Sequence, residues 1–395
     1  MEIRRGTAAD GAACRALWGY CFERPGDPFF EWYFGRVYRP EDTLVGLEAG
    51  RAACALHLRP YTLSVRGRTM RADYIVGVAV HPAARGRGLA HELLAGAFRA
   101  SRAAGKAADI LMPSDAALYF SCGFGFYAHQ WAREAAPERL ARLGRRAAKA
   151  RALEGPEEWA LLAGIYRAHA AGRHGYALRD EASWRRHIEG QLREGYIAVV
   201  YDEDGPAGYL CYGIDGRTLA ASEAAWSSEA GRRGLYAYMA GHRGSVDRCR
   251  WYEPLDDASY LFWTDGAEHT YVENRTFPYM MARVTDPAAA FTGLAAQAEG
   301  TVSFLLEDGT LPENGGAYTL RARGGRTEAA RGGAPAFSLT PSGAAHLLFG
   351  ALPPAALFAA GEAAWRTDDR DERERALRFL RANFPKENNW ISEWY

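Results

Sequence analysis

The chain has 395 residues, of which 48% are hydrophobic and 24% are charged. Lysine plus arginine and aspartate plus glutamate number 48 each, so the formal net charge is +0 at pH 7. The length predicts two or three domains, and the balanced charge argues against nucleic acid or an anionic membrane as the main partner.

Compartment and metal content follow from what the sequence lacks. The six cysteines form no C-x-x-C pair and show no metal-ligand spacing, which predicts reduced thiols and no metal site. No apolar run is long enough to span a bilayer, and the first residues have no apolar signal region. We therefore expect a cytoplasmic protein.

The first third of the chain predicts alternating strands and helices. "EIRR" reads as a strand, "AACRALWGYCF" as a helix, and an aromatic-rich segment follows from residue 29 to 38. Three stretches that are separated by turn residues are then predicted as strands, and the last of them is "DYIVGVAVHP". After an Arg/Gly loop come a helix, the buried strand "ADILM", a short helix in "SDAALYFSCGF" and the strand "FGFYAHQW".

The remainder predicts a second and a third unit. The charged, alanine-rich "AAPERLARLGRRAAKARALEGPEEW" reads as helical and contains a domain boundary. Helices near 157–171, 181–193 and 229–241, with hairpins between them, repeat the element order of the first unit. "MMARVTD" begins a strand meander followed by proline-started helices. We expect an α+β fold of mixed sheets with domains at 1–148, 149–283 and 284–395.

The stretch "VGVAVHPAARGRGLAHELLAG" combines a buried strand, an Arg/Gly loop and an amphipathic helix. A helix N-terminus offers unpaired N–H groups, glycines allow close backbone approach, and arginines add forked donors, so this order suits a diphosphate. The alternative is a basic, solvent-exposed turn. The buried strand before the loop and the small Ala90 in the first helical turn favour the diphosphate cradle.

Arg85-x-x-Gly88-x-Ala90 resembles the Q/R-x-x-G-x-G/A motif of the GCN5-related N-acetyltransferases. "PYMMARVTDPAAAF" and the aromatic C-terminus are similar to the Eis-type (enhanced intracellular survival) branch of that family. The resemblance implies a catalytic acetyltransferase domain, a second and degenerate one, and a sterol-carrier-like domain that delivers the C-terminus. It also implies acetyl-CoA as co-substrate and a homo-oligomer such as a hexamer.

The resemblance assigns the cofactor-side residues. The strand backbone at Val78, Ala79 and Val80 would pair with the pantetheine arm. The diphosphate loop would comprise Arg85, Gly86, Arg87, Gly88, Leu89 and Ala90. Ser114 would lie beside the cofactor, with a helix N-cap as its alternative role. Tyr119 would be the general acid toward the departing thiolate, with a packed core tyrosine as its alternative.

The acceptor side is predicted from the same resemblance. The part "YIVGVAVHP" of the predicted fourth strand carries no carboxylate, so the resemblance assigns the role of base to the terminal carboxylate of Tyr395, with His81 as a competing candidate. Aromatic and acidic residues suited to a cationic amine are Asp27, Glu31, Trp32 and Glu393. Helix-packing aromatics with solvated acids are the alternative for each of them.

The implied activity is direct transfer of an acetyl group from acetyl-CoA to an amine. The branch implies an aminoglycoside, a polyamine or a lysine side chain as acceptor. A covalent relay through Cys122 is disfavoured, because its "CGF" setting is typical of a packed helix end. The alternative function is a non-catalytic scaffold that binds CoA or a lipid.

Overall fold

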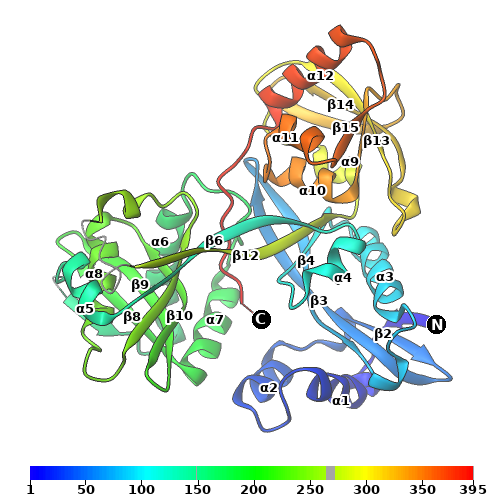
Figure 1. Cartoon of the computed structure of the whole chain (residues 1–395). Helices are drawn as coiled ribbons and strands as arrows, with labels where there is room; N and C mark the ends of the chain where they lie inside the picture. Colours follow the sequence, from blue (N-terminus) through cyan, green and yellow to red (C-terminus); the bar gives the residue numbers. More distant parts are fainter. Residues whose placement is uncertain (148, 264–271, 395) are drawn as a thin grey trace.

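The computed structural model describes residues 1–147, 149–263 and 272–394. Two β-sheets organise it (Figure 1). The larger is a continuous twelve-stranded sheet in the order β1-β2-β3-β4-β5-β12-β6-β11-β10-β9-β8-β7. The smaller has five strands in the order β15-β14-β13-β16-β17. The mixed sheets and their covering helices confirm the predicted α+β class.

The N-terminal region forms one half of the large sheet and its covering helices. Its elements are β1 (Glu2–Arg5), α1 (Gly11–Cys21), α2 (Pro28–Trp32), β2 (Thr43–Glu48), β3 (Arg51–Val65), β4 (Arg68–Val80), α3 (Leu89–Ala103), β5 (Ala108–Leu111), α4 (Ala116–Ser121) and β6 (Gly125–Ala135). The buried face of α3, which includes Leu89, Leu93 and Ala97, has the spacing that the sequence predicts.

The middle region forms the other half of the large sheet. Its elements are α5 (Pro137–Leu143), β7 (Lys149–Ala152), α6 (Trp159–Ala170), α7 (Glu181–Glu194), β8 (Tyr196–Asp202), β9 (Gly205–Asp215), β10 (Thr218–Trp226), α8 (Glu229–Ala240), β11 (Arg248–Pro254) and β12 (Glu273–Val284). The prediction of one helix through the alanine-rich segment is wrong beyond Leu143. There the helix ends at Gly144, and β7 pairs with β8 as an edge strand.

The C-terminal region contains the small sheet and docks on the N-terminal region. Its elements are α9 (Pro287–Phe291), β13 (Gly300–Leu306), β14 (Gly316–Arg323), β15 (Arg326–Arg331), β16 (Phe337–Leu339), α10 (Pro341–Phe349), α11 (Pro354–Ala359), β17 (Ala363–Trp365) and α12 (Arg370–Asn383). One hydrophobic cluster joins the two regions. Buried Arg283 adds a bidentate ion pair with Asp308 at 2.7 Å.

The strand β12 crosses the expected boundaries between units. It lies between β5 and β6, with Met281 opposite Leu111 and Phe277 opposite Gln130. A strand that precedes the C-terminal region in sequence therefore completes the sheet of the N-terminal region. The boundaries at 148/149 and 283/284 stay predictions, because strand order in space does not follow them.

After α12 the chain returns between the two halves of the large sheet (Figure 1). We call residues 385–394 the C-terminal tail. Asn389 forms an isolated parallel β-bridge with His174, and the Gln130 side chain donates a hydrogen bond to the Ile391 carbonyl at 2.5 Å. No helix in the described part of the chain is both long and apolar enough to cross a membrane.

Candidate functional site

The strands β4 and β5 are paired for only part of their length. Residues Ala72 to Tyr74 lie opposite Ala108 to Ile110 in parallel register, and β5 ends one residue later. The rest of β4 runs on, and no described strand pairs with that edge. The far side of β5 is taken by β12. β4 therefore runs past the end of β5 as one wall of a wedge, and its backbone edge there has no described strand partner.

The predicted strand residues Val78, Ala79 and Val80 form this wall. Ala79 is buried against α1, whereas Val78 and Val80 are half-buried against the main core. Gly77, just before them, has φ +63 and lies beneath the ring of Trp18. A Cβ at Gly77 would lie 2.3 Å from that ring, so the close approach of α1 to β4 requires glycine here.

The loop after β4 presents its backbone to the opening of the wedge. Gly86 and Gly88 have φ +75 and +78, and Gly88 is the N-cap of α3 without a side-chain cap. Among the described residues, no acceptor is found for the amides of residues 86–90. A Cβ at either glycine would meet nothing within 4 Å. Unpaired amides at a helix N-terminus, with open space before them, suit an anion.

The two arginines of this loop contact protein groups. Arg87 donates to both carboxylate oxygens of Glu48, at 2.8 and 2.6 Å. Arg85 donates from Nε to the Val80 carbonyl at 3.2 Å and lies over the Tyr20 ring. Both are exposed, and exposed pairs contribute at most about 1 kcal/mol. The predicted contacts of Arg85 and Arg87 with a diphosphate stay predictions, and backbone amides are the donors this geometry offers.

The short helix α4 carries Tyr119. This residue is 8% exposed, and burial, followed by Cys122 and Asp115, raises the pKa of its phenol to about 12. A phenol with this pKa is protonated at neutral pH and available to donate. The N-cap of α4 is Asp115, which accepts from the Ala117 amide at 3.0 Å, so the capping role considered for Ser114 is wrong. Ser114 lies exposed just before it.

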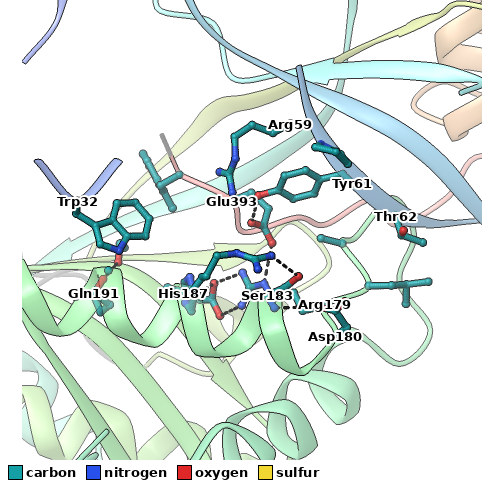
Figure 2. Close-up of a pocket in the computed structure, with 18 of the residues that line it drawn as sticks. Trp32, Arg59, Tyr61, Thr62, Arg179, Asp180, Ser183, His187, Gln191 and Glu393 are labelled. Carbon is teal, nitrogen blue, oxygen red and sulfur yellow. Dashed lines mark hydrogen bonds and ion pairs between the residues drawn. The ribbon is translucent and has the colours of Figure 1, made fainter. Parts of the chain in front are cut away.

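A cavity of about 570 Å³ lies between the N-terminal region and α7 (Figure 2). Its walls come from α2, β3, α7, β10 and the C-terminal tail. The residues that line it include Phe29, Trp32, Tyr61, Arg71, Arg186, Glu194 and Glu393. Trp32 and Glu393, two of the predicted acceptor residues, thus lie on one cavity.

The carboxylate of Glu393 is held by groups from both halves of the large sheet. It accepts from the Tyr61 hydroxyl at 2.8 Å and from Arg179 Nε at 2.8 Å. The Tyr74 hydroxyl donates to its backbone carbonyl at 3.1 Å. Arg179 also donates to both oxygens of Glu223, at 3.0 and 2.7 Å. These contacts fix the C-terminal tail immediately before its end.

The charges around Arg179 are strongly coupled. Burial acts to raise the pKa of Glu223, but Arg179 and His187 outweigh it and lower that pKa to about 2. Burial, together with Arg179, lowers the pKa of His187. Glu223 is therefore ionised and His187 neutral near pH 7. No local pattern in the sequence points to this cluster, because Arg179 precedes a helix and Glu223 lies in a strand without any motif.

The other predicted acceptor residues take different places. Asp27 is the N-cap of α2, accepting from the Phe29 amide at 2.9 Å. Glu31 pairs with Arg15 at 3.1 Å and accepts from the Gly26 amide. Neither lines the cavity, because each is directed to cap or brace α2. Their role in acceptor binding stays a prediction.

Tyr395, the predicted base, lies outside the described residues. Its neighbour Trp394 is described and packs against Tyr252, Phe277 and Tyr279, with ring centroids 4.9, 5.9 and 4.9 Å apart. The tail is therefore docked up to Trp394, as its apolar composition favours.

The two alternative catalytic groups, His81 and Cys122, occupy positions that are typical of structural residues. His81 is exposed, and its Nδ1 accepts from the Ala83 amide at 3.3 Å, which makes it a cap after β4. Cys122 is fully buried, and burial raises the pKa of its thiol. Neither setting favours a base or a covalent relay. Within the described ranges, no group of three or more histidine, cysteine, aspartate or glutamate side chains could hold a metal ion.

Comparisons with known proteins agree with this architecture. Residues 2–127 match the family described as acetyltransferase (GNAT) domain, and residues 175–284 match a second family of the same description. Residues 286–392 match the sterol carrier protein domain. A comparison with curated proteins gave no significant match.

Solved structures share the fold along the full chain. A GCN5-related N-acetyltransferase from Anabaena variabilis is 20% identical with a TM-score of 0.83, and 100% of each chain is covered. Another from Kribbella flavida is 22% identical with a TM-score of 0.81, covering 100% of this chain and 98% of that one. Eis1 from Mycobacterium abscessus is 17% identical with a TM-score of 0.76, with 100% of each chain covered.

The class follows from the two family matches and the wedge between β4 and β5: the chain is a GNAT acetyltransferase with two domains of that kind. With its sterol carrier protein domain, it has the Eis-type three-domain architecture, and its fold is that of Eis1 throughout.

Proposed function

We propose that the chain transfers the acetyl group of acetyl-CoA to a primary amine. The observation that carries this proposal is the combination of the unpaired edge of β4 beyond the end of β5 and the unpaired amides of residues 86–90 at the start of α3. The amides would bind the diphosphate, and the free edge of β4 would pair with the pantetheine arm. This arrangement would direct the thioester toward the interior of the sheet.

The proposed reaction is a direct displacement. The nitrogen lone pair of the neutral amine attacks the thioester carbonyl carbon, the new C–N bond forms, and the C–S bond breaks. Tyr119 donates its phenolic proton to the leaving sulfur, and the terminal carboxylate of Tyr395 takes the proton from the amine. The docking of the tail through Glu393 and Trp394 supports this role for the chain end. The products are the N-acetylated amine and free CoA thiol.

The acceptor classes that the family resemblance implies are aminoglycosides, polyamines and lysine side chains. The aromatic wall of the cavity at Phe29 and Trp32 supports an amine as acceptor, since a cation is attracted to aromatic faces. A homo-oligomer and a cytoplasmic location stay predictions. Exposed Leu261 and Phe262, at 67% and 81%, support self-association, and sedimentation velocity on the full chain would measure it.

Thiol release from acetyl-CoA with a panel of amines tests the proposal. Tyr119→Phe should lower kcat about a hundredfold with little change in acetyl-CoA binding, because only proton donation is lost. Tyr196→Phe, at an exposed position on β8, is the control and should leave kcat unchanged. Full activity of Tyr119→Phe would refute the assignment of the general acid. No thiol release with any amine would favour the scaffold alternative.

The terminal carboxylate is tested separately by adding a few residues after Tyr395. This change moves the carboxylate away while the contacts of Glu393 remain available. We expect turnover to fall sharply and the dissociation constant of acetyl-CoA, measured by calorimetry, to stay the same. Undiminished turnover would show that another group accepts the proton.

A further inference from the structure

One face of α7 runs along the cavity. The cavity-lining residues of this helix follow the spacing i, i+3, i+4, i+7, i+8 and i+11, and they are Ser183, Arg186, His187, Gly190, Gln191 and Glu194. Arg186 and Glu194 are about 12 Å apart along the helix axis, at a rise of about 1.5 Å per residue. Figure 2 shows Ser183 and Gln191 along this helix, with Gln191 on the side of Trp32.

The N-terminal end of this face is basic. Arg186 and Arg71 both line the cavity. Arg71 of β4 is opposite Thr62 of β3, whose carbonyl accepts from the Leu178 amide just before α7. Both arginines are exposed, and no carboxylate pairs with either of them within the described ranges.

Lys106, the neighbouring cation, is already paired with Asp73. The acid nearby, Asp180, also lines the cavity and is the N-cap of α7 through the Ser183 amide at 2.8 Å. Hydrogen bonds from Ser183, followed by the charge of Arg186, lower its pKa, so it offsets part of the positive charge.

The C-terminal end of the same face is acidic and aromatic. Burial raises the pKa of Glu194, and the charges of Asp27 and Glu23 raise it further, so the three carboxylates lie within electrostatic range. Phe29 and Trp32 line the cavity beside Glu194. Carboxylates next to aromatic faces form an environment that attracts a cation.

The centre of the cavity contributes little net charge. Arg179 is shared between Glu223 and Glu393, with N–O distances of 2.7 and 2.8 Å. Arg59 also lines the cavity, so the formal charges of these two arginines and two glutamates cancel. A ligand that enters would therefore meet unbalanced charge mainly at the two ends. The two ends have opposite signs.

The acidic end adjoins the acetyl donor's side of the sheet. Trp18 covers Gly77 in the unpaired part of β4, and its ring stacks on Tyr33 at 4.5 Å. Tyr33 in turn stacks on Phe29 at 5.9 Å. Arg71, by contrast, lies at the start of β4, where this strand is still paired with β5. The acidic end is thus connected through these rings to the unpaired part of β4, whereas Arg71 lies beside the paired part.

We propose that the acceptor is a zwitterion: an elongated molecule with a primary amine at one end and a carboxylate or phosphate at the other. This inference rests on the proposed acetyl transfer and narrows its acceptor class. Glu194 and the aromatic wall attract the amine, and Arg71 and Arg186 bind the anion by charge-assisted hydrogen bonds. A polycation such as an aminoglycoside would place positive charge against both arginines.

Three matched acceptors test this assignment: an eight-carbon ω-amino acid, the corresponding monoamine and the corresponding diamine. They share the reacting amine and differ only in the far end group. With the full chain and acetyl-CoA, we expect kcat/KM about tenfold higher for the amino acid than for the monoamine, and lowest for the diamine. Arg186→Ala should remove this preference mainly through KM, and Arg186→Glu should favour the diamine.

Arg185→Ala is the control, because Arg185 is the next residue of α7 but pairs with Glu157 and Glu181 and does not line the cavity. It should leave all three kcat/KM values unchanged. Equal rates for the three acceptors, or the highest rate with the diamine or with kanamycin, would overturn the zwitterion and leave acetyl transfer intact. No thiol release with any acceptor, although acetyl-CoA binds, would overturn both.

Discussion

Arg179 links the middle region to the C-terminal tail. Its side chain is 4% exposed, donates to the Ser392 carbonyl at 2.5 Å, and is paired with both Glu223 and Glu393. A buried charge that loses its partner is costly, so this arginine stabilises two carboxylates at once. In the middle region the N-terminus of α8 is capped by the Ser228 side chain, which accepts from the Gly231 amide. The contacts of Arg179 give this region a structural part in the site.

Arg179→Met should destabilise the protein by about 3–5 kcal/mol, because both carboxylates would be left buried without a counter-charge. Urea unfolding measures this loss. Arg217→Met is the matched control in the same region: Arg217 forms an exposed pair with Asp247, and its loss should cost at most about 1 kcal/mol. Similar losses for the two variants would contradict the role of Arg179.

Buried histidines predict acid sensitivity. Burial, with help from Arg59, lowers the pKa of His57 to about 3, and burial, with help from Arg173, lowers that of His169 to about 3. Below pH 6.5 the unfolded chain binds protons at these sites and the folded chain does not. Stability should therefore fall with decreasing pH by about 1.4 kcal/mol per unit for each histidine, down to about pH 3. Thermal unfolding between pH 7 and 4.5 measures the slope, and His57→Gln should make it shallower.

The loop between β4 and α3 is the element on which we expect acetyl-CoA binding to depend. Gly88 and Gly361 have nearly the same backbone conformation, with φ +78 and +76, and open space where a Cβ would be. An alanine at either site should cost about 1 kcal/mol of folding stability, since left-handed backbone disfavours a Cβ. Only Gly88→Ala should weaken acetyl-CoA binding, by about tenfold, because only there does the methyl group face the diphosphate.

Calorimetric titration of acetyl-CoA into both variants measures this difference. Equal affinities for Gly88→Ala and Gly361→Ala would show that the loop glycines serve only as turns. The helix α7 shows the same principle on the acceptor side, because a Cβ on Gly190 would lie 2.8 Å from the Trp32 ring. The absence of a side chain there lets α2 approach α7 and close that end of the cavity.

The insertion of β12 between β5 and β6 makes the large sheet one structural unit. Its residues Met280, Met281 and Ala282 are fully buried between β5 and β6. Residues 1–148 lack this strand, so an isolated fragment of that length would expose two apolar strand edges. We expect it not to fold cooperatively, as measured by amide dispersion in NMR spectra, whereas the full chain in the same buffer gives a native spectrum. A well-dispersed fragment spectrum would contradict this expectation.

Many elements could be predicted from periodicity and turn residues, including α3, α7, α8 and the proline-started helices α10 and α11. The helix expected through residues 144–152 was wrong, because alanine-rich local propensity was overridden by pairing of β7 with β8. The insertion of β12 could not be predicted, since no local pattern specifies which distant strand fills a gap in a sheet.

The strand, loop and helix that we propose as the diphosphate site could be predicted from the sequence because they are local and follow one another within residues 68–103. Of the residues that line the cavity, the sequence predicted only Trp32 and Glu393. Tyr61 and Glu393 touch across 332 residues of sequence, and Arg179 joins them from a third segment. A site formed by one continuous segment can be predicted from the order of its residues. A cavity between distant segments depends on how the sheets and the tail pack together, which local sequence does not specify.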